Sequence, residues 1–341
     1  MKKMNYLIVL VVIVMSIILS SANVFSAEVI KWKGQCWVGV TDLAYKSFEK
    51  LCNRVKIATN GRLEITPHPD GAIVPAYQML DAIKGNVIQA MNGAAIYWAG
   101  KDPAFALLGD LNAAWTHPWE ADAYFHYHGG LEFLREAYKP FGVYPVGVTW
   151  VGVEVMPLKK CVRKVDDFKG LKLRTPHGIP AEFFKRMGAS AVILPGGEVY
   201  SGLEKGIIDG TDWGTPSMNY RMKFHEVCKY YNWPGFHSMA TMDFCVNLGE
   251  WNKLPGDIKA ILESAVREFA WDMVETGAVD SYKAIEEMKA KGVTQCVWSD
   301  EELTKARKIA QGVWEDWAKK SPLCQKVYDS VTSYLKMIGK L

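Results

Sequence analysis

Several sequence patterns are missing from this 341-residue chain, and each absence disfavours a class of protein. No C-x-x-C pair occurs among the seven cysteines, so the ligand spacing of common zinc and dithiol sites is lacking. No G-x-S-x-G, P-loop, H-E-x-x-H or dinucleotide-binding glycine motif occurs, which argues against the enzymes that depend on them. Basic residues form no long run and the formal net charge is only +3, so we expect no nucleic-acid partner.

Low-complexity tracts and internal repeats are absent as well. Hydrophobic residues make up 49% of the chain and charged residues 23%, which is the balance of a globular protein rather than a disordered one. A chain of 341 residues is too long for one small core. We therefore expect a globular protein with two lobes.

After residue 27, no apolar stretch is long enough for a membrane span, which needs about 20 residues. The apolar stretch before it runs from Tyr6 to Leu19, with two lysines ahead of it and small residues behind it. This order is typical of a secretory signal peptide. We expect residues 1–27 to be that peptide, cleaved after Ser26 or Ala27, and the protein to be exported to the periplasm. An uncleaved anchor is the alternative.

Export permits disulfides, but the number of cysteines is odd and their spacings are wide. We expect most of them to be small buried hydrophobic residues. A single disulfide bond is the alternative for two of them. The cysteines are Cys36, Cys52, Cys161, Cys228, Cys245, Cys296 and Cys324.

Short strands alternate with helices in the first third of the chain. We expect strands at 29–32, 62–66 and 87–91, a helix from about Asp42, and a second helix that opens at Pro75. This alternation predicts parallel strand pairing and an α/β sheet.

The rest of the chain contains longer segments. A helix is expected at 121–138, and the apolar stretch 144–155 is long enough to be a strand shared by both lobes. A second α/β unit is expected at 156–240. Apolar residues recur at helical spacing in 257–291, which predicts one helix of about 50 Å that lies across both lobes as a spine.

These segments predict the following division of the chain. The signal peptide is 1–27, lobe I is 28–150 with about 241–256, lobe II is 151–240, the spine helix is 257–291, and a C-terminal helical segment is 292–341. The C-terminal segment has more apolar positions than an exposed tail needs, so it should pack on the body or on another subunit.

Arg174 is the first candidate site residue. It ends the alternating run 171–174, and Pro176 stops the strand two residues later. Rigid backbone would therefore hold the guanidinium, whose planar fork can bind a carboxylate through two parallel hydrogen bonds. The alternative is a surface arginine whose side chain points into solvent.

Asp212 and Trp213 follow another predicted strand. Trp213 would offer a ligand a flat apolar wall and an indole N–H, unless it only packs in the core. Asp212 would repel a bound carboxylate unless a cation lay between them, and Ca²⁺ and Na⁺ take oxygen ligands. Otherwise Asp212 caps a helix or pairs with a lysine.

Four other residues are candidates for the same site. Glu154 interrupts an apolar run, so it is either a solvated acid at a strand end or a contact to the ligand or metal. Tyr97 and Trp98 follow the third strand and would cover the pocket, although aromatic residues there are equally expected in a lobe core. His237 is the fourth candidate. The metal candidates are Asp212, Trp213 and Glu154.

In its longer motifs, the chain resembles the extracytoplasmic solute-binding proteins of tripartite ATP-independent periplasmic (TRAP) transporters, the DctP type. The motifs occupy 165–174 and 198–210, with shorter matches at 59–61, 80–85 and 251–255. The resemblance covers essentially the whole chain after the leader. It implies a two-lobed periplasmic-binding-protein (Venus-flytrap) fold that closes on a ligand without a catalytic step.

Residues 194–198 and the pair Asp212–Trp213 are most similar to the branch that binds 2-oxo and 2-hydroxy monocarboxylates. The resemblance places the family's carboxylate-binding arginine on Arg174 and the branch's metal-binding acid on Asp212. It implies a small organic acid as ligand, with Ca²⁺ or Na⁺ beside it and no required cofactor. The branch usually has glutamine or arginine about twenty residues before the key arginine, where this chain has Val153 and Glu154, and often a second acid where it has Ser238.

The resemblance also implies delivery of the acid to the small and large TRAP membrane subunits, and it leaves a homodimer through the C-terminal helices open. Two other functions compete, a periplasmic module for sensing or scavenging and a secreted enzyme. His126 and His128 could suggest a metal enzyme, but residues two apart lie on different sides of a helix. We therefore expect a binding protein and not an enzyme.

Overall fold

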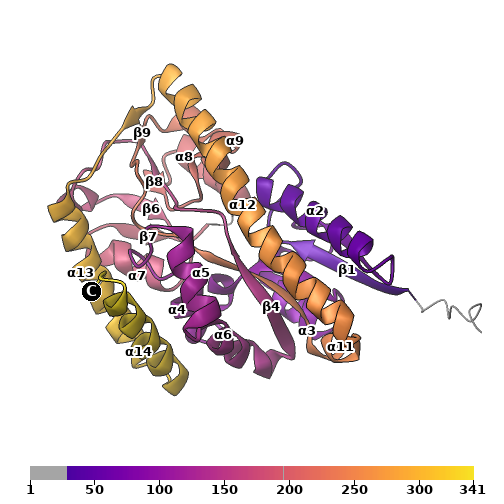
Figure 1. The fold of residues 1–341 in the computed structure, drawn as a ribbon. Coiled ribbons are helices and arrows are strands. Elements are labelled where there is room, and N and C mark those ends of the chain that lie inside the picture. The colour runs from indigo at the N-terminus through magenta and orange to yellow at the C-terminus, as the bar shows by residue number, and fades with distance from the viewer. Residues whose placement is uncertain (1–28, 195) are drawn as a thin grey trace, which may run out of the picture.

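The computed structural model describes residues 29–194 and 196–341, so the expected leader at 1–27 lies outside the described residues. Figure 1 shows a mixed α/β molecule in which helices surround two sheets. The first sheet has the strand order β2-β1-β3-β10-β4 and the second β11-β9-β5-β8-β6-β7. This architecture confirms the two-lobed α/β fold expected from the sequence.

The first sheet combines parallel and antiparallel pairs. β1 pairs in parallel with β2 and β3, while β10 enters between β3 and β4 and is antiparallel to both. The strand expected at 87–91 begins three residues later, because pairing with β1 starts at Ala90. The strands are β1 (Ile30–Cys36), β2 (Leu63–His68), β3 (Ala90–Ala94), β4 (Val143–Trp150) and β10 (Thr241–Asn247).

Several short helices cover this sheet. The single helix expected at 121–138 is wrong, because Gly129 has a φ of 92° and breaks it into two helices. A side chain at Gly130 would also meet the ring of Tyr124 at 2.7 Å. The helices are α2 (Leu43–Ala58), α3 (Met79–Lys84), α4 (Ala104–Gly109), α5 (Pro118–Tyr127), α6 (Gly130–Tyr138) and α11 (Leu248–Lys253).

The second sheet brings two strand ends together at one edge. β6 pairs in parallel with β8, with Arg174 opposite Thr211, so Arg174 and Asp212 leave neighbouring strands at the same end. The strands are β5 (Pro157–Leu158), β6 (Lys172–Arg174), β7 (Ser190–Val192), β8 (Gly210–Thr211), β9 (Tyr230–Tyr231) and β11 (Thr294–Gln295). The helices are α7 (Ile179–Arg186), α8 (Val199–Glu204), α9 (Pro216–Arg221) and α10 (Phe224–Val227).

The long helix α12 spans Gly256–Ala290, as expected, and runs along both halves of the molecule (Figure 1). It packs against β4 and α2 in one half of the molecule and against α9 in the other half. Gly277 does not interrupt it, and a Cβ there would lie 3.3 Å from the carbonyl oxygen of Val151. The expected strand 144–155 ends earlier, at Trp150, and Gly152 with a φ of 105° turns the chain toward the second sheet.

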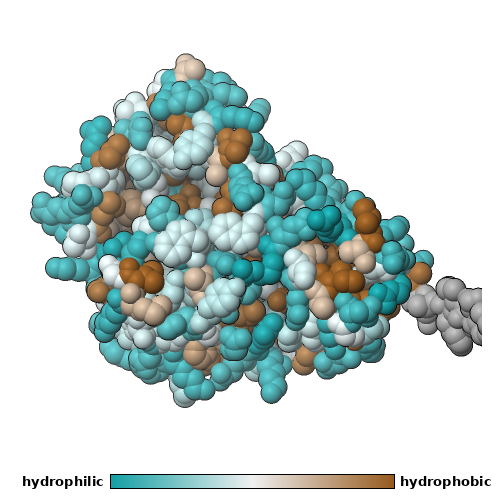
Figure 2. Space-filling model, viewed as in Figure 1, coloured by the Kyte–Doolittle hydropathy of each residue, from teal (hydrophilic) through white to brown (hydrophobic). Residues whose placement is uncertain are grey.

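Two helices, α13 (Asp300–Ala318) and α14 (Pro322–Met337), follow α12. α13 packs on α7, and α14 packs on α4 and α6. Val327, Val331 and Leu335 of α14 are buried there, so its apolar face is covered within the same chain. On the face shown in Figure 2, hydrophobic residues occur in small groups among hydrophilic ones.

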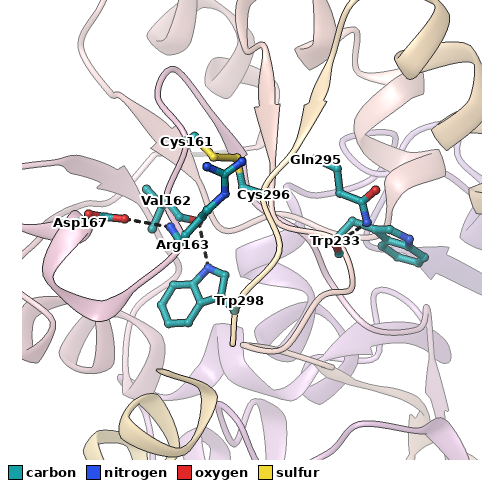
Figure 3. Close-up of a disulfide and its surroundings, with 8 residues drawn as sticks. All are labelled: Cys161, Val162, Arg163, Asp167, Trp233, Gln295, Cys296 and Trp298. Carbon is teal, nitrogen blue, oxygen red and sulfur yellow. Dashed lines mark hydrogen bonds between the residues drawn. A yellow bond between two sulfur atoms is a disulfide. The ribbon is translucent and has the colours of Figure 1, made fainter. Parts of the chain in front are cut away.

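Cys161 and Cys296 form a disulfide (Figure 3), which joins the loop after β5 to the segment that follows α12. The other five cysteines are free and buried, as expected for small hydrophobic residues. Among residues 29–194 and 196–341, no helix combines the length and hydropathy that a membrane crossing requires.

Candidate functional site

A cavity of about 40 Å³ is lined by residues of both sheets and the segments that join them. One part of its lining is charged and another part is aromatic or aliphatic. The lining residues are Trp37, Ile96, Tyr97, Asp110, Glu154, Arg174, Pro176, Asp212, Trp213, Gly214, Met218, Ala240 and Met242.

Arg174 is held in this cavity by main-chain acceptors. Its side chain is buried, its Nε donates to the carbonyl of Leu194 at 3.1 Å, and its Nη1 donates to that of Asp212 at 2.9 Å. The guanidinium carbon lies 4.8 Å from the centre of the Trp213 ring. These two bonds use two of the five N–H donors of the guanidinium, so an oriented cation still has donors for a ligand.

Trp213 forms a wall of the cavity. A Cβ at Gly196 would lie 2.4 Å from the indole Cη2, so only glycine lets the backbone at residue 196 approach this ring. The indole Nε1 is buried and has no hydrogen-bond partner among the described residues. A buried donor of this kind is normally paired, and a ligand oxygen would pair it.

Three buried carboxyl groups lie on the charged side of the cavity, on Asp110, Glu154 and Asp212. Burial, followed by the negative charges of Asp212 and Asp110, raises the pKa of Glu154 well above its usual value. Burial and the charge of Asp212 likewise raise the pKa of Asp110. The hydroxyl of Ser238 opposes that rise, because it donates to both Asp110 oxygens at 2.9 and 3.0 Å.

The acids fit a hard cation. Ligand atoms of Glu154, Asp212 and His237 all lie within 4.8 Å of one another. Oδ2 of Asp212 is buried without a partner in the described chain, and carboxylate oxygens suit Ca²⁺ or Na⁺. The imidazole Nε2 of His237 is already 2.8 Å from Asp212 Oδ1, so His237 orients the aspartate. Glu154 and Asp212 would therefore be the residues that hold an ion.

Most of the site residues expected from the sequence meet here. Arg174, Trp213, Asp212, Glu154 and Tyr97 line the cavity. His237 lies behind Asp212 and does not line the cavity.

Trp98 is only 1% exposed and does not line the cavity either. Its ring is stacked at 5.9 Å on that of Tyr97, which does. Asp110 was missed, although it stands alone in an apolar segment as Glu154 does. That signal could have identified Asp110 as a candidate.

Comparison with known families and proteins gives consistent results. Residues 35–321 match the model of the DctP family, described as bacterial extracellular solute-binding protein, family 7. A monocarboxylate 2-oxoacid-binding periplasmic protein of Nostoc is 31% identical over 85% of this chain and 80% of its own length. The C4-dicarboxylate-binding periplasmic protein DctP of Rhodobacter capsulatus is 24% identical over 79% of this chain and 77% of its own length.

Two solved structures are similar to the whole described fold. A TRAP transporter solute-binding protein from Bordetella bronchiseptica has a TM-score of 0.85 at 27% identity, covering 91% of this chain and 93% of that one. It is a mixed-occupancy dimer with calcium and picolinate in the occupied site. A TRAP solute-binding protein from Pseudoalteromonas atlantica has a TM-score of 0.82 at 26% identity, covers 91% and 95%, and contains sodium and pyruvate.

Proposed function

Because the chain belongs to the DctP family of bacterial extracellular solute-binding proteins, we propose that it is the receptor of a TRAP transporter for a small 2-oxo or 2-hydroxy monocarboxylate. Members of this family bind small organic acids outside the cytoplasm and work with TRAP membrane subunits; they are binding proteins rather than enzymes. The acid would bind in the cavity at Arg174 and be passed to the membrane subunits.

One observation carries the ligand assignment, the buried and oriented guanidinium of Arg174, which lies 4.8 Å from the Trp213 ring in the cavity lining. A carboxylate that enters the cavity can accept hydrogen bonds from this guanidinium. Such charge-assisted bonds stabilise the bound state by about 1.5–3 kcal/mol each. Apolar side chains such as Ile96 and Met218 supply the remaining contacts.

The second part of the proposal is a cation beside the ligand, held by Glu154 and Asp212. A hard ion there would let an acidic ligand and Asp212 share one site. Glu154 and Asp212 both line the cavity, and ligand atoms of these two residues lie within 4.8 Å of each other, which supports this placement.

Two structural expectations stay predictions. The first is the division into lobe I, lobe II and spine helix, in which the two lobes would move as separate bodies. Closure of the two lobes would remove a bound acid from water. A homodimer through the C-terminal helices would need a face that α14 does not already bury in its own chain. Sedimentation equilibrium tests the dimer, because a mass equal to one chain contradicts it.

The test is calorimetric titration of refolded protein with pyruvate and with lactate, in the presence of Ca²⁺. Refolding removes acid that survives purification. The proposal predicts saturable one-site binding of at least one of the two acids, which is lost or strongly weakened in Arg174→Lys. Absence of binding by both acids would contradict the ligand class. Loss of acid uptake on gene deletion would separate transport from sensing or scavenging.

A further inference from the structure

A second hollow continues outward from the cavity at Arg174. It has a volume of about 380 Å³ and shares three lining residues with the inner cavity, Trp37, Tyr97 and Trp213. Its far side is formed by Tyr77 and Asp70 from the first half of the chain and by Gly197 and Met222 from the second. Pockets of drug-sized ligands measure about 300–1,000 Å³, so a three-carbon acid would leave much of this space empty.

Aromatic rings wall the passage between the two hollows. The ring of Tyr77 is stacked on that of Tyr97 with centroids 4.3 Å apart and planes 25° apart. Trp37 meets Tyr97 edge to face at 6.3 Å. The rings are held by one another before any ligand enters, so little side-chain freedom is lost when a flat group packs on them.

The aromatic side chains that line the passage lie next to Arg174, which would bind the carboxylate. Trp213 lines both hollows, and its ring centre lies 4.8 Å from the guanidinium carbon of Arg174. The atoms that follow a carboxylate bound at Arg174 would therefore reach Trp213 and Tyr97, which lead into the outer hollow.

The position of Arg174 gives the ligand a direction, because Arg174 lines the inner cavity, whereas the charged residues of the outer hollow are Asp42, Asp70 and Arg221. Asp110, Glu154, Arg174 and Asp212 all line the inner cavity, which suits a carboxylate with an adjacent oxo or hydroxyl oxygen. The remainder of the molecule has to leave past Trp213 and Tyr97 into the outer hollow. Flat unsaturated rings pack favourably between aromatic side chains, in stacked or edge-to-face arrangements.

We propose that the ligand is an aromatic 2-oxo acid, an arylpyruvate, whose ring occupies the outer hollow and packs against Tyr77 and Trp37. This inference rests on the proposed function, which assigns the carboxylate of the ligand to Arg174. It adds the chemical class of the group that is attached to the 2-oxo acid. A short acid such as pyruvate would fill only the inner cavity.

Two glycines allow a direct test. Gly39 and Gly197 line the outer hollow from opposite halves, neither has a positive φ, and a Cβ at either position would meet nothing within 4 Å. Gly39→Leu and Gly197→Leu should therefore fold while narrowing the outer hollow. Gly256→Leu is the matched control, because Gly256 is equally open but begins α12 and lines neither hollow.

The experiment is calorimetric titration of refolded protein with phenylpyruvate and with pyruvate, and thermal unfolding verifies that each variant is folded. The wild type should bind phenylpyruvate at least about tenfold more tightly than pyruvate, a difference of about 1.4 kcal/mol. Each outer-hollow variant should reduce this ratio at least about tenfold, and Gly256→Leu should leave it unchanged.

If the wild type binds pyruvate as tightly as phenylpyruvate, or more tightly, the proposal that the ligand is aromatic is contradicted, while the proposed function is not. A ratio that stays the same in both outer-hollow variants would overturn the placement of the ring. Failure of both acids to bind would overturn the proposed function as well.

Discussion

His237 and Asp212 form a buried pair in which the imidazole Nε2 lies 2.8 Å from the carboxylate Oδ1, with side-chain exposures of 0% and 2%. The main-chain carbonyl of the same aspartate accepts from Arg174. Residue 212 is therefore held at two points, by the guanidinium through its backbone and by the imidazole through its side chain. The oxygen that remains without a partner in the described chain, Oδ2, is the one that a cation would take.

His237→Gln should weaken Ca²⁺ binding by about 10–100-fold, because residues that orient a metal ligand contribute affinity of that order. Calcium titration followed by tryptophan fluorescence measures this, and His128→Gln, which lies outside the cavity lining, is the control. In the wild type, chelation with EDTA should lower the affinity for pyruvate or phenylpyruvate, and in Asp212→Asn it should have much less effect. If chelation does not change the affinity for the acid, the proposal that a cation is bound at this site is contradicted.

Arg174→Lys should weaken binding of the acid by about ten- to a hundredfold, the loss of at least one charge-assisted hydrogen bond of about 1.5–3 kcal/mol. Lysine keeps the positive charge but lacks the planar fork. It is preferable to alanine, which would leave the carbonyls of Leu194 and Asp212 without their donor. Calorimetry gives the dissociation constants, and Arg186→Lys, at a surface ion pair with Asp316, is the control. Equal affinities in wild type and Arg174→Lys would contradict the clamp.

Local patterns predicted much of the fold and part of the site. The helical repeat of 257–291 predicted α12 because its apolar row continues without a helix-ending signal. The alternating run before Arg174 predicted a strand end, and parallel pairing of β6 with β8 then placed Asp212 beside it. These relationships depend on residues that are close in sequence or on adjacent strands.

Features that depend on long-range packing were not predicted. Asp110 lines the cavity and accepts a hydrogen bond from Ser238, which lies 128 residues away in the sequence. Tyr77 was assigned to a helix opening at Pro75, whereas it lies in a short 3-10 turn, Ala76–Gln78, ahead of α3 and stacks on Tyr97. The disulfide partner of Cys161 is 135 residues away, and nothing in the local sequence around either cysteine selects that pairing.

Reduction of the Cys161–Cys296 disulfide should lower the melting temperature. The bond closes a loop of 135 residues, and the chain-entropy argument gives a stabilisation of about 5 kcal/mol at most for a loop of that length. Thermal unfolding with and without dithiothreitol measures the effect. The double variant Cys161→Ser with Cys296→Ser should melt lower than the wild type and should not respond to dithiothreitol. A wild-type melting temperature that is insensitive to reduction would contradict the role of the bond.

Asp243 should make the stability of the protein depend on pH. It is fully buried in β10, and the hydroxyl of Tyr138 donates to its Oδ2 at 2.5 Å. Burial raises the pKa of this carboxyl to about 6, compared with about 3.9 in an unfolded chain. Because the folded pKa is the higher one, the contribution of Asp243 to stability is present below about pH 4 and is lost as the pH rises through about 6.

Asp243→Asn removes the ionisation while keeping an oxygen that accepts from Tyr138. The stability of the variant relative to the wild type should therefore rise between pH 4 and pH 7.5, by about 3 kcal/mol at most, since each pKa unit corresponds to about 1.4 kcal/mol. Urea unfolding of both proteins at each pH gives this difference directly, and effects of other titrating groups cancel because both proteins contain them. A difference that stays constant across this range would mean that Asp243 does not titrate there, and the buried carboxylate would then need another compensating donor or charge beside Tyr138.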